Sequence, residues 1–230
     1  MSSDALSVRL RLAVAGFRLD VAFDVPPGIT VLFGPSGSGK STTLAALAGL
    51  VRPSEGRISL GETPWFDSAL HVDVPPEARD VSLVFQSLAL FPHLTAERNV
   101  EYGIARAVPA VERRDRARAM LERMRVGHVA GRLPNTFSGG EAQRVALARA
   151  FACAPRVVLL DEAFSALDRE LREALGADVR AMVSELSVPA IVVTHLAREA
   201  RALGDRAVSL RDGRVTASGA VHDVVSDGGA

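Results

Sequence analysis

The chain has 230 residues, of which 48% are hydrophobic and 23% are charged, and 27 basic residues balance 27 acidic ones. This is the composition of an ordinary globular protein, and its zero net charge gives no overall support to nucleic-acid binding, so we expect no nucleic-acid partner. No apolar run approaches the ~20 residues that cross a bilayer, and the N-terminus lacks the apolar segment of a secretory signal.

Three strands are predicted at the N-terminus. Residues 6–33 contain two alternating runs around Gly16, which predict an antiparallel hairpin leading into an apolar strand, Ile29–Phe33. The next residues, 34–42, read GPSGSGKST, and so many glycines disfavour both a strand and a helix interior. Alanines and leucines at helical spacing then predict a helix over 41–50.

A strand, a glycine-rich turn and a helix are the context of a phosphate-binding loop. Gly34, Gly39, Lys40 and Ser41 fit the pattern G-x-x-x-x-G-K-[ST]. Backbone N–H groups at a helix N-terminus can bind a triphosphate, lysine neutralises its β- and γ-phosphates, and the serine hydroxyl is placed to bind Mg²⁺. The flanking elements argue against a chance Gly/Ser loop. The predicted nucleotide-binding residues are Gly34, Pro35, Ser36, Gly37, Ser38, Gly39, Lys40, Ser41 and Thr42.

The middle of the chain changes from turns to helices. Residues 54–80 are rich in turn formers, and a second buried strand is predicted at Val81–Phe85. From 87 to about 136 the pattern is helical, with one apolar face that includes Ala117 and Leu121. The opposite face is rich in arginine, and we interpret it as a solvated face rather than a nucleic-acid patch. This segment is predicted to be a helical lobe inserted into the core.

Two more apolar strands follow, RVVLLDEA at 156–163 and PAIVVTH at 189–195. Apolar runs without alternation, separated by helices, predict a parallel sheet covered on both faces. Asp161 ends the first strand, where a carboxylate can hold Mg²⁺, and Glu162 can polarise an attacking water. A solvated strand end is the alternative, which the phosphate loop disfavours.

Two smaller predictions concern single features of the sequence. The one cysteine, Cys153, cannot form an internal disulfide, which suits a reducing cytoplasm, and we expect it to fill the core. The last five residues, SDGGA, are predicted to be disordered.

A second glycine-rich anion site precedes another predicted helix. Ser138, Gly139 and Gly140 lie in FSGGEAQRVALARA, residues 137–150, and offer a hydroxyl and backbone N–H groups. One nucleotide does not need two such sites in one chain. The simplest resolution is a head-to-tail dimer, either a homodimer or paired ATPase subunits, in which each subunit covers the γ-phosphate held by the other in the ATP state.

The ATP-binding cassette (ABC) ATPases carry a signature close to LSGGQ-x-QRVALARAL, and residues 137–150 are similar to it. With the other motifs, the chain resembles this family over roughly residues 5–225. Phe137 and Glu141 stand where that signature has Leu and Gln, and Arg98 and Ala163 replace the usual Glu and Pro. The resemblance implies an α/β fold with a P-loop NTPase (RecA-like) core, an antiparallel β subdomain and an inserted helical subdomain.

The same resemblance implies how the chain is divided into domains. Residues 1–230 would form a single ABC ATPase domain, with its core at about 1–86 and 137–230 and the helical subdomain at about 87–136. No C-terminal regulatory domain is expected.

The resemblance also implies residue roles, with ATP and Mg²⁺ as cofactors. The implied catalytic residues are Glu162 (the catalytic glutamate), His195 (the switch histidine) and Gln86 (the Q-loop glutamine). The implied metal ligands are Ser41, Gln86 and Asp161, the last as the Walker B aspartate. Residues 165–168, SALD, are similar to the D-loop, and Phe17 is the candidate for stacking on adenine, with core packing as the alternative.

Residues 75–103 and 132–140 are similar to prokaryotic importer ATPases, and the compact start of the chain is closest to molybdate importers. This implies an ATP-hydrolysing subunit on the cytoplasmic face of the inner membrane, with transmembrane permease subunits and a separate solute-binding protein as partners. Leu90, Phe91, Pro92 and Leu94 would be part of the permease-docking surface, with a buried lobe core as the alternative.

Other members of the family remain as alternatives. An exporter or another membrane complex would carry the same nucleotide motifs, as would a soluble ABC ATPase of DNA maintenance or of translation. The soluble types are disfavoured, because the chain has no sustained heptads and only one set of motifs. A non-hydrolytic regulatory module would be expected to lose Glu162 or His195, and both are present.

Overall fold

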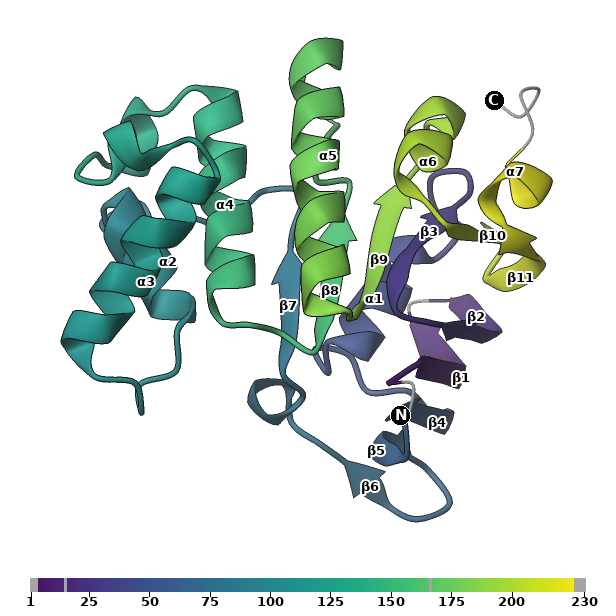
Figure 1. The fold of residues 1–230 in the computed structure, drawn as a ribbon. Helices are drawn as coiled ribbons and strands as arrows, with labels where there is room; N and C mark the ends of the chain where they lie inside the picture. The colour runs from purple at the N-terminus through teal and green to yellow at the C-terminus, as the bar shows by residue number, and fades with distance from the viewer. Residues whose placement is uncertain (1–3, 15, 166, 226–230) are drawn as a thin grey trace.

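The structure is a computed structural model, and it describes residues 4–14, 16–165 and 167–225. Their strands form one sheet in the order β6-β5-β4-β1-β2-β11-β10-β3-β9-β8-β7 (Figure 1). The strands are β1 (Leu6–Val14), β2 (Phe17–Val25), β3 (Gly28–Phe33), β4 (Glu55–Leu60), β5 (Thr63–Asp67), β6 (Val72–Asp73), β7 (Val81–Val84), β8 (Val157–Asp161), β9 (Pro189–Thr194), β10 (Arg206–Arg211) and β11 (Arg214–Ala220). The five residues predicted to be disordered, 226–230, lie outside the described residues.

Helices cover this sheet and extend beyond it at one side (Figure 1). The helices are α1 (Lys40–Leu47), α2 (Ala96–Gly103), α3 (Ala110–Arg123), α4 (Gly139–Ala152), α5 (Arg169–Leu186), α6 (Ala197–Leu203) and α7 (Val221–Val224). Short 3₁₀ turns are η1 (Pro76–Ala78), η2 (Gly127–Val129) and η3 (Pro134–Thr136). Among the described residues, no helix has both the length and the apolar character needed to span a membrane.

The central strands are buried on both faces, which explains their unbroken apolar sequence. β10, β3, β9, β8 and β7 pair in parallel. Val157 and Leu159 belong to the core shared with α1 and the N-terminal strands, whereas Val158 and Leu160 belong to the core shared with α4 and α5. Because side chains alternate along a strand, a strand covered on both sides needs an apolar residue at every position. The predicted parallel sheet is therefore confirmed.

The sequence predicts only part of the antiparallel region of the sheet. The predicted hairpin is present, with Leu6 opposite Val25 at its open end. However, residues 54–80 contain β4, β5 and β6 as well as turns, so the interpretation of this segment as turns was incomplete. These strands are short, and a register shift at Ile58/Ser59 breaks the regular pairing of β4 with β5, so the alternation that marks a strand is weak.

The two parts of the sheet meet at a narrow seam. β11 pairs with β2 through one parallel pair, Arg214 with Asp20. The Asp20 N–H also donates to the carbonyl of Gly213 at 2.8 Å. A Cβ at Gly213 would lie 2.0 Å from the Arg18 carbonyl oxygen, so this close approach requires glycine.

The helices α2, α3 and α4 pack together beside the sheet (Figure 1). Ala117 and Leu121 of α3 are buried as predicted. Arginines on the other side of α3 are exposed and form ion pairs, among them Arg118 with Glu97 at 2.5 Å and Arg123 with Glu185. The arginine-rich face is thus solvated and paired with acidic side chains.

Two further predictions need correction. The helix predicted over 41–50 ends at Leu47, because Gly49 takes a left-handed conformation (φ 79°) and the Leu50 N–H donates to the Ala45 carbonyl, which closes the helix. Cys153 does not fill the core. It is exposed at the C-cap of α4, with its Sγ 2.9 Å from the Ser82 hydroxyl, because the buried helix ends one residue earlier.

Arg79 is a buried cation that holds the C-terminus of α1. Its side chain is 1% exposed, and its guanidinium donates to the carbonyls of Ala46 (2.9 Å) and Leu47 (3.0 Å), with Asp73 at 3.4 Å. Burial lowers the pKa of Arg79, opposed by Asp73. A cation here stabilises the negative end of the helix dipole and satisfies carbonyls that the helix leaves unpaired.

We expect Arg79→Met to lower the free energy of unfolding by about 3 kcal/mol, since it leaves buried carbonyls without a donor and removes charge-assisted hydrogen bonds. Urea denaturation followed by circular dichroism measures this. The matched control is Arg116→Met, which breaks the exposed pair with Glu112 and should cost about 0.5 kcal/mol or less. Equal losses in the two variants would contradict the role assigned to Arg79.

Candidate functional site

Most of the predicted site residues meet at one edge of the parallel sheet. The loop 34–39 follows β3, Asp161 and Glu162 lie at the end of β8, and His195 follows β9. Gln86 lies two residues after β7. Because β3, β9, β8 and β7 are parallel neighbours, their carboxyl ends lie together, which is where open α/β sheets bind ligands.

The phosphate loop needs its glycines for steric reasons. Gly34 and Gly39 have φ angles of 150° and 101°. A Cβ at Gly34 would lie 2.2 Å from the Leu210 carbonyl oxygen, and one at Gly39 would lie 2.8 Å from Leu19 Cδ1 and 3.1 Å from the Phe17 ring. A larger residue at either position would force the loop away from the sheet.

Lys40 folds back over this loop. Its ammonium group donates to the carbonyls of Gly34 and Pro35, both at 2.8 Å, and the residue is only 6% exposed. Burial lowers the pKa of Lys40, while Glu162 and Asp161 oppose that shift. Two neutral carbonyls are weak partners for a buried cation, so an anion bound in the loop would be stabilised by it.

Two observations indicate that the loop fits a polar ligand. Ser38 is buried, and its hydroxyl is one of two buried side-chain polar atoms in the described part of the chain without a hydrogen-bond partner. Beside it, Gly37 (φ 79°) has open space where a side chain would stand. An oxygen-rich ligand would fill the space beside Gly37, in a loop that still has an unpaired polar group.

A cavity of about 480 Å³ opens over the loop. Its lining residues are Phe17, Ser36, Gly37, Gly39, Lys40, Ser41, Thr42 and Glu162. Phe17 thus comes from β2, on the far side of the seam, and joins the loop residues around one space. Gly34, Pro35 and Ser38 are predicted loop residues that do not line it.

The acidic residues beside the cavity have separate partners. The Ser41 hydroxyl donates to Asp161 Oδ1 at 3.1 Å, and burial raises the pKa of Asp161. Gln86 Nε2 donates to Glu162 Oε2 at 3.3 Å, and His195 Nδ1 lies 3.4 Å from Glu162 Oε1. The three predicted catalytic residues therefore meet.

Glu162 has a left-handed backbone conformation, with φ 47°. Its N–H donates to the Val193 carbonyl at 3.2 Å, and its own carbonyl accepts from the Ser165 hydroxyl at 2.9 Å. These bonds hold a conformation that costs energy for a residue with a side chain, and such strain is often found at functional sites. Ala166, in the segment similar to a D-loop, lies outside the described residues.

Oxygen ligands suited to Mg²⁺ lie at the contact between Ser41 and Asp161. A hydroxyl and a carboxylate are the hard donors that Mg²⁺ prefers, so this pair fits the ion. Gln86, the third predicted ligand, contacts Glu162 through its amide nitrogen, and no hydrogen bond joins it to Ser41 or Asp161 within the described residues.

The predicted second anion site, Ser138–Gly140, lies at the N-terminus of α4 and does not line the cavity. It closes with a capping box: the Ser138 hydroxyl accepts from the Glu141 N–H at 3.3 Å, and Glu141 Oε2 accepts from the Ser138 N–H at 2.7 Å. Glu141 Oε1 also lies 2.9 Å from His128 Nε2. The bond from the Ser138 backbone, with help from His128, lowers the pKa of Glu141 to about 2.

Sequence reasoning noted Glu141 only as a departure from the signature and missed its contact with His128. The spacing S-x-x-E before a helix could have revealed the capping box. His128 had no such signal, because η2 brings it to Glu141 from 13 residues away.

The predicted docking residues are partly core and partly surface. The Phe91 backbone is held by Asn99, and its ring centroid lies 4.4 Å from that of Tyr102, which is 62% exposed. Pro92 is exposed, whereas Leu90 and Leu94 are half-buried. The segment is therefore only partly buried in the lobe core, and its role in docking stays a prediction.

Comparison with known proteins places these features in a family. The family model described as "ABC transporter" matches residues 19–165. The molybdenum import ATP-binding protein ModC 1 of Azotobacter vinelandii is 42% identical over 98% of this chain and 63% of its own length. The molybdate/tungstate import ATP-binding protein WtpC of Archaeoglobus fulgidus is 40% identical over 96% of this chain and 89% of its own length.

Solved structures agree with the fold. The dimeric structure of MJ0796, a bacterial ABC transporter cassette, has a TM-score of 0.79 and 29% identity, covering 95% of this chain and 99% of that one. A second structure of MJ0796, in a post-hydrolysis state bound to ADP and Pi, has the same TM-score. The expected P-loop α/β fold is confirmed.

The chain spans about three fifths of the length of ModC relatives such as those of A. vinelandii and Pseudomonas fluorescens, 63% and 62%. The family match at residues 19–165 spans the phosphate loop, the acidic pair and the predicted second anion site. The chain belongs to the ABC transporter family.

Proposed function

We propose that the protein is the ATP-hydrolysing subunit of an ABC importer of molybdate or a related oxyanion. The main support for ATP hydrolysis is that Gln86 and His195 both contact Glu162 beside the phosphate loop. The names of relatives from A. vinelandii and A. fulgidus support the cargo.

In this proposal ATP binds in the cavity over the phosphate loop. Lys40 releases the carbonyls of Gly34 and Pro35 and donates to the β- and γ-phosphates. Backbone N–H groups at the start of α1 face the phosphates. Phe17 stacks on the adenine ring, because it lines the same cavity.

Glu162 acts as the general base in hydrolysis. Its carboxylate accepts a proton from the attacking water, which Gln86 helps to orient, and His195 donates a hydrogen bond to the γ-phosphate. Ser41 and Asp161, with Gln86 as a further ligand, would hold Mg²⁺, which when bound neutralises charge on the phosphates. The contact of both Gln86 and His195 with one carboxylate supports this assignment.

Two copies form the hydrolytic unit. Ser138–Gly140 does not line the chain's own nucleotide cavity, so it is available to cover the γ-phosphate held by a second copy. The Glu141 carboxylate fixes Ser138 through the capping box, so the hydroxyl and the glycine N–H groups stay oriented. The likeness to a dimeric cassette supports this arrangement.

Hydrolysis would be transmitted to the membrane through the Gln86 region and a helical subdomain at about 87–136. The exposed parts of Phe91, Pro92 and Tyr102 would contact a transmembrane permease subunit. The protein would then be peripheral on the cytoplasmic face of the inner membrane, and a separate solute-binding protein would deliver the oxyanion. An exporter is the alternative, which the import names of the relatives disfavour.

We expect Phe17→Ala to weaken Mg-ATP binding about fivefold to tenfold, since an aromatic contact contributes about 1 kcal/mol beyond area burial. Isothermal titration calorimetry measures the affinity, and Phe17→Trp should retain it. A variant with unchanged affinity and a lower melting temperature would instead assign Phe17 to core packing.

Glu162→Gln should lower kcat for ATP hydrolysis by about 100-fold or more, because the amide cannot accept the proton. Multi-angle light scattering should then find a dimer with Mg-ATP and a monomer with ADP. Glu62→Gln, at an exposed glutamate remote from the site, is the control with normal activity. A mass that stays monomeric in both nucleotides would refute the two-copy mechanism.

The cargo is tested by elemental analysis. A source strain lacking this gene, grown at limiting trace anion, should lose cell molybdenum or tungsten in mass spectrometry. Complementation with wild type should restore the element, and Glu162→Gln should not. If molybdenum, tungsten and sulfur all stay constant, oxyanion import is wrong while the ATPase assignment stands.

A further inference from the structure

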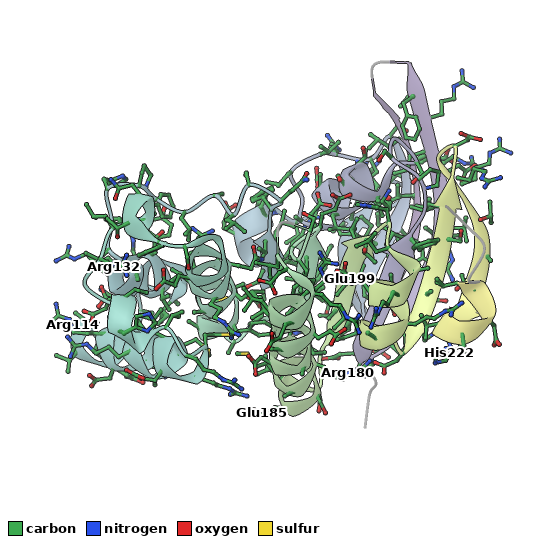
Figure 2. The ribbon with its side chains drawn as sticks, turned by 90° about the horizontal axis from the view of Figure 1, so that it is seen from above. Arg114, Arg132, Arg180, Glu185, Glu199 and His222 are labelled. Carbon is green, nitrogen blue, oxygen red and sulfur yellow. The ribbon has the colours of Figure 1, made fainter. Side chains whose placement is uncertain are left out.

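A second cavity, of about 480 Å³, lies between α5 and α6. We name it the α5–α6 groove. Its lining residues are Arg169, Arg172, Glu173, Gly176, Ala177, Arg180, Leu196, Ala197, Arg198, Glu199, Ala202 and Leu203. It shares no lining residue with the cavity over the phosphate loop, so it is a separate site. Arg180 and Glu199, labelled in Figure 2, lie on the side of α5 that faces the C-terminal strands.

Small residues create the groove. Gly176 lets α6 approach α5, since a Cβ there would lie 2.5 Å from Leu203 Cδ2. Ala177, Ala197 and Ala202 have only methyl groups, so they leave the space above this contact unfilled and give the floor an apolar surface. The volume is within the range of about 300–1,000 Å³ that is usual for small-molecule sites.

The rim of the groove has an excess of positive charge at one end. Arg169 Nε and Arg198 Nη2 both donate to the same oxygen, Glu173 Oε1, at 3.0 and 3.2 Å. The two arginine side chains are 69% and 68% exposed. Two guanidinium groups sharing one carboxylate oxygen leave donors in solvent, and their fork geometry suits a bidentate anion.

The other charges of the rim are balanced within the protein. Arg180 is paired with Asp205 at 2.7 Å. Arg172 donates to the carbonyls of Phe164 and Leu167, and its charge faces Glu199, whose pKa is raised by burial. The excess charge is therefore concentrated at Arg169 and Arg198, next to an apolar floor.

We propose that the α5–α6 groove binds a small amphiphilic anion. Its apolar body would lie on Ala177, Ala202 and Leu203, and its carboxylate, sulfonate or phosphate group would be held between Arg169 and Arg198. An apolar cavity combined with unneutralised charge at one end matches this class of ligand.

The groove is attached to both segments that carry the predicted catalytic residues. Arg172 holds the carbonyls of Phe164 and Leu167, a few residues after Glu162. Glu199, which is 7% exposed, accepts from the hydroxyl of Thr194, the residue before His195. Arg172 and Glu199 both line the groove, so a bound anion would lie beside side chains that are hydrogen-bonded to each segment.

The probe for the test is 8-anilinonaphthalene-1-sulfonate, a fluorescent aromatic sulfonate, titrated into the full chain without nucleotide. We expect Arg198→Gln and Arg169→Gln each to weaken its binding about fivefold, because each removes a charge-assisted hydrogen bond. Ala177→Trp, at an exposed helix position, should fill the groove and abolish binding. Arg116→Gln removes an exposed, paired arginine on α3 and is the control with unchanged binding.

Other outcomes would overturn the proposal. Dye binding that is lost in Phe17→Ala and kept in Ala177→Trp would place the dye in the phosphate-loop cavity. If Ala177→Trp leaves dye binding intact and instead dissociates a nucleotide-free dimer in light scattering, the groove is an interface between copies. Circular dichroism of each variant checks the fold, and the two arginine variants keep the test valid if Ala177→Trp unfolds.

Discussion

The site is organised around a buried ammonium group that the protein solvates with its own backbone. Lys40 donates to the carbonyls of Gly34 and Pro35, and this bond pattern closes the phosphate loop on itself. A buried cation must be compensated, and here the partners are two dipoles rather than a carboxylate, although Asp161 and Glu162 lie near enough to affect its pKa. The glycines of the loop, its position at the end of β3 and the adjacent acidic residues can all be understood as conditions for keeping this charge in the protein interior.

Much of the fold could be predicted because its strongest signals are local. The unbroken apolar runs at β8 and β9 follow from burial on both faces, and the phosphate loop follows from its glycines. Two predictions failed for different reasons. β4 depends on its pairing with β1, which is distant in sequence, whereas Cys153 is exposed because the helix ends just before it. The end of α1 was predictable in principle from Gly49, whose left-handed conformation closes the helix.

The same distinction applies to the site. Parallel strand ends converge by topology, so the meeting of Gln86, Glu162 and His195 could be expected once each was assigned to a strand end. The hydrogen-bond partner of each side chain could not be predicted in this way. Gln86 turns its amide nitrogen toward Glu162, and Glu141 is hydrogen-bonded both to its own helix start and to His128. Such choices depend on rotamers and on helix placement, which no periodicity records.

Arginines lie both at the rim of the α5–α6 groove and at the C-terminus of α1, but their energetics differ. Arg79 is enclosed, and its donors are used on carbonyls of α1 and Val74, so it stabilises one arrangement of the chain. Arg169 and Arg198 remain in water and share one acceptor, so each keeps donors available for an external anion. Burial and acceptor supply, rather than residue type, separate a structural arginine from one that can bind a ligand.

The narrow seam between β2 and β11 has a mechanical consequence. One residue pair, which includes the hydrogen bond from the Asp20 N–H to the Gly213 carbonyl, joins β2 to β11, so the ladder resists relative rotation least at this line. Phe17 lies on one side of the seam and Lys40 on the other, and both line a single cavity. A molecule in contact with both residues would link the two parts of the sheet across the seam. The antiparallel strands would then rotate less relative to the parallel strands when the cavity is filled than when it is not.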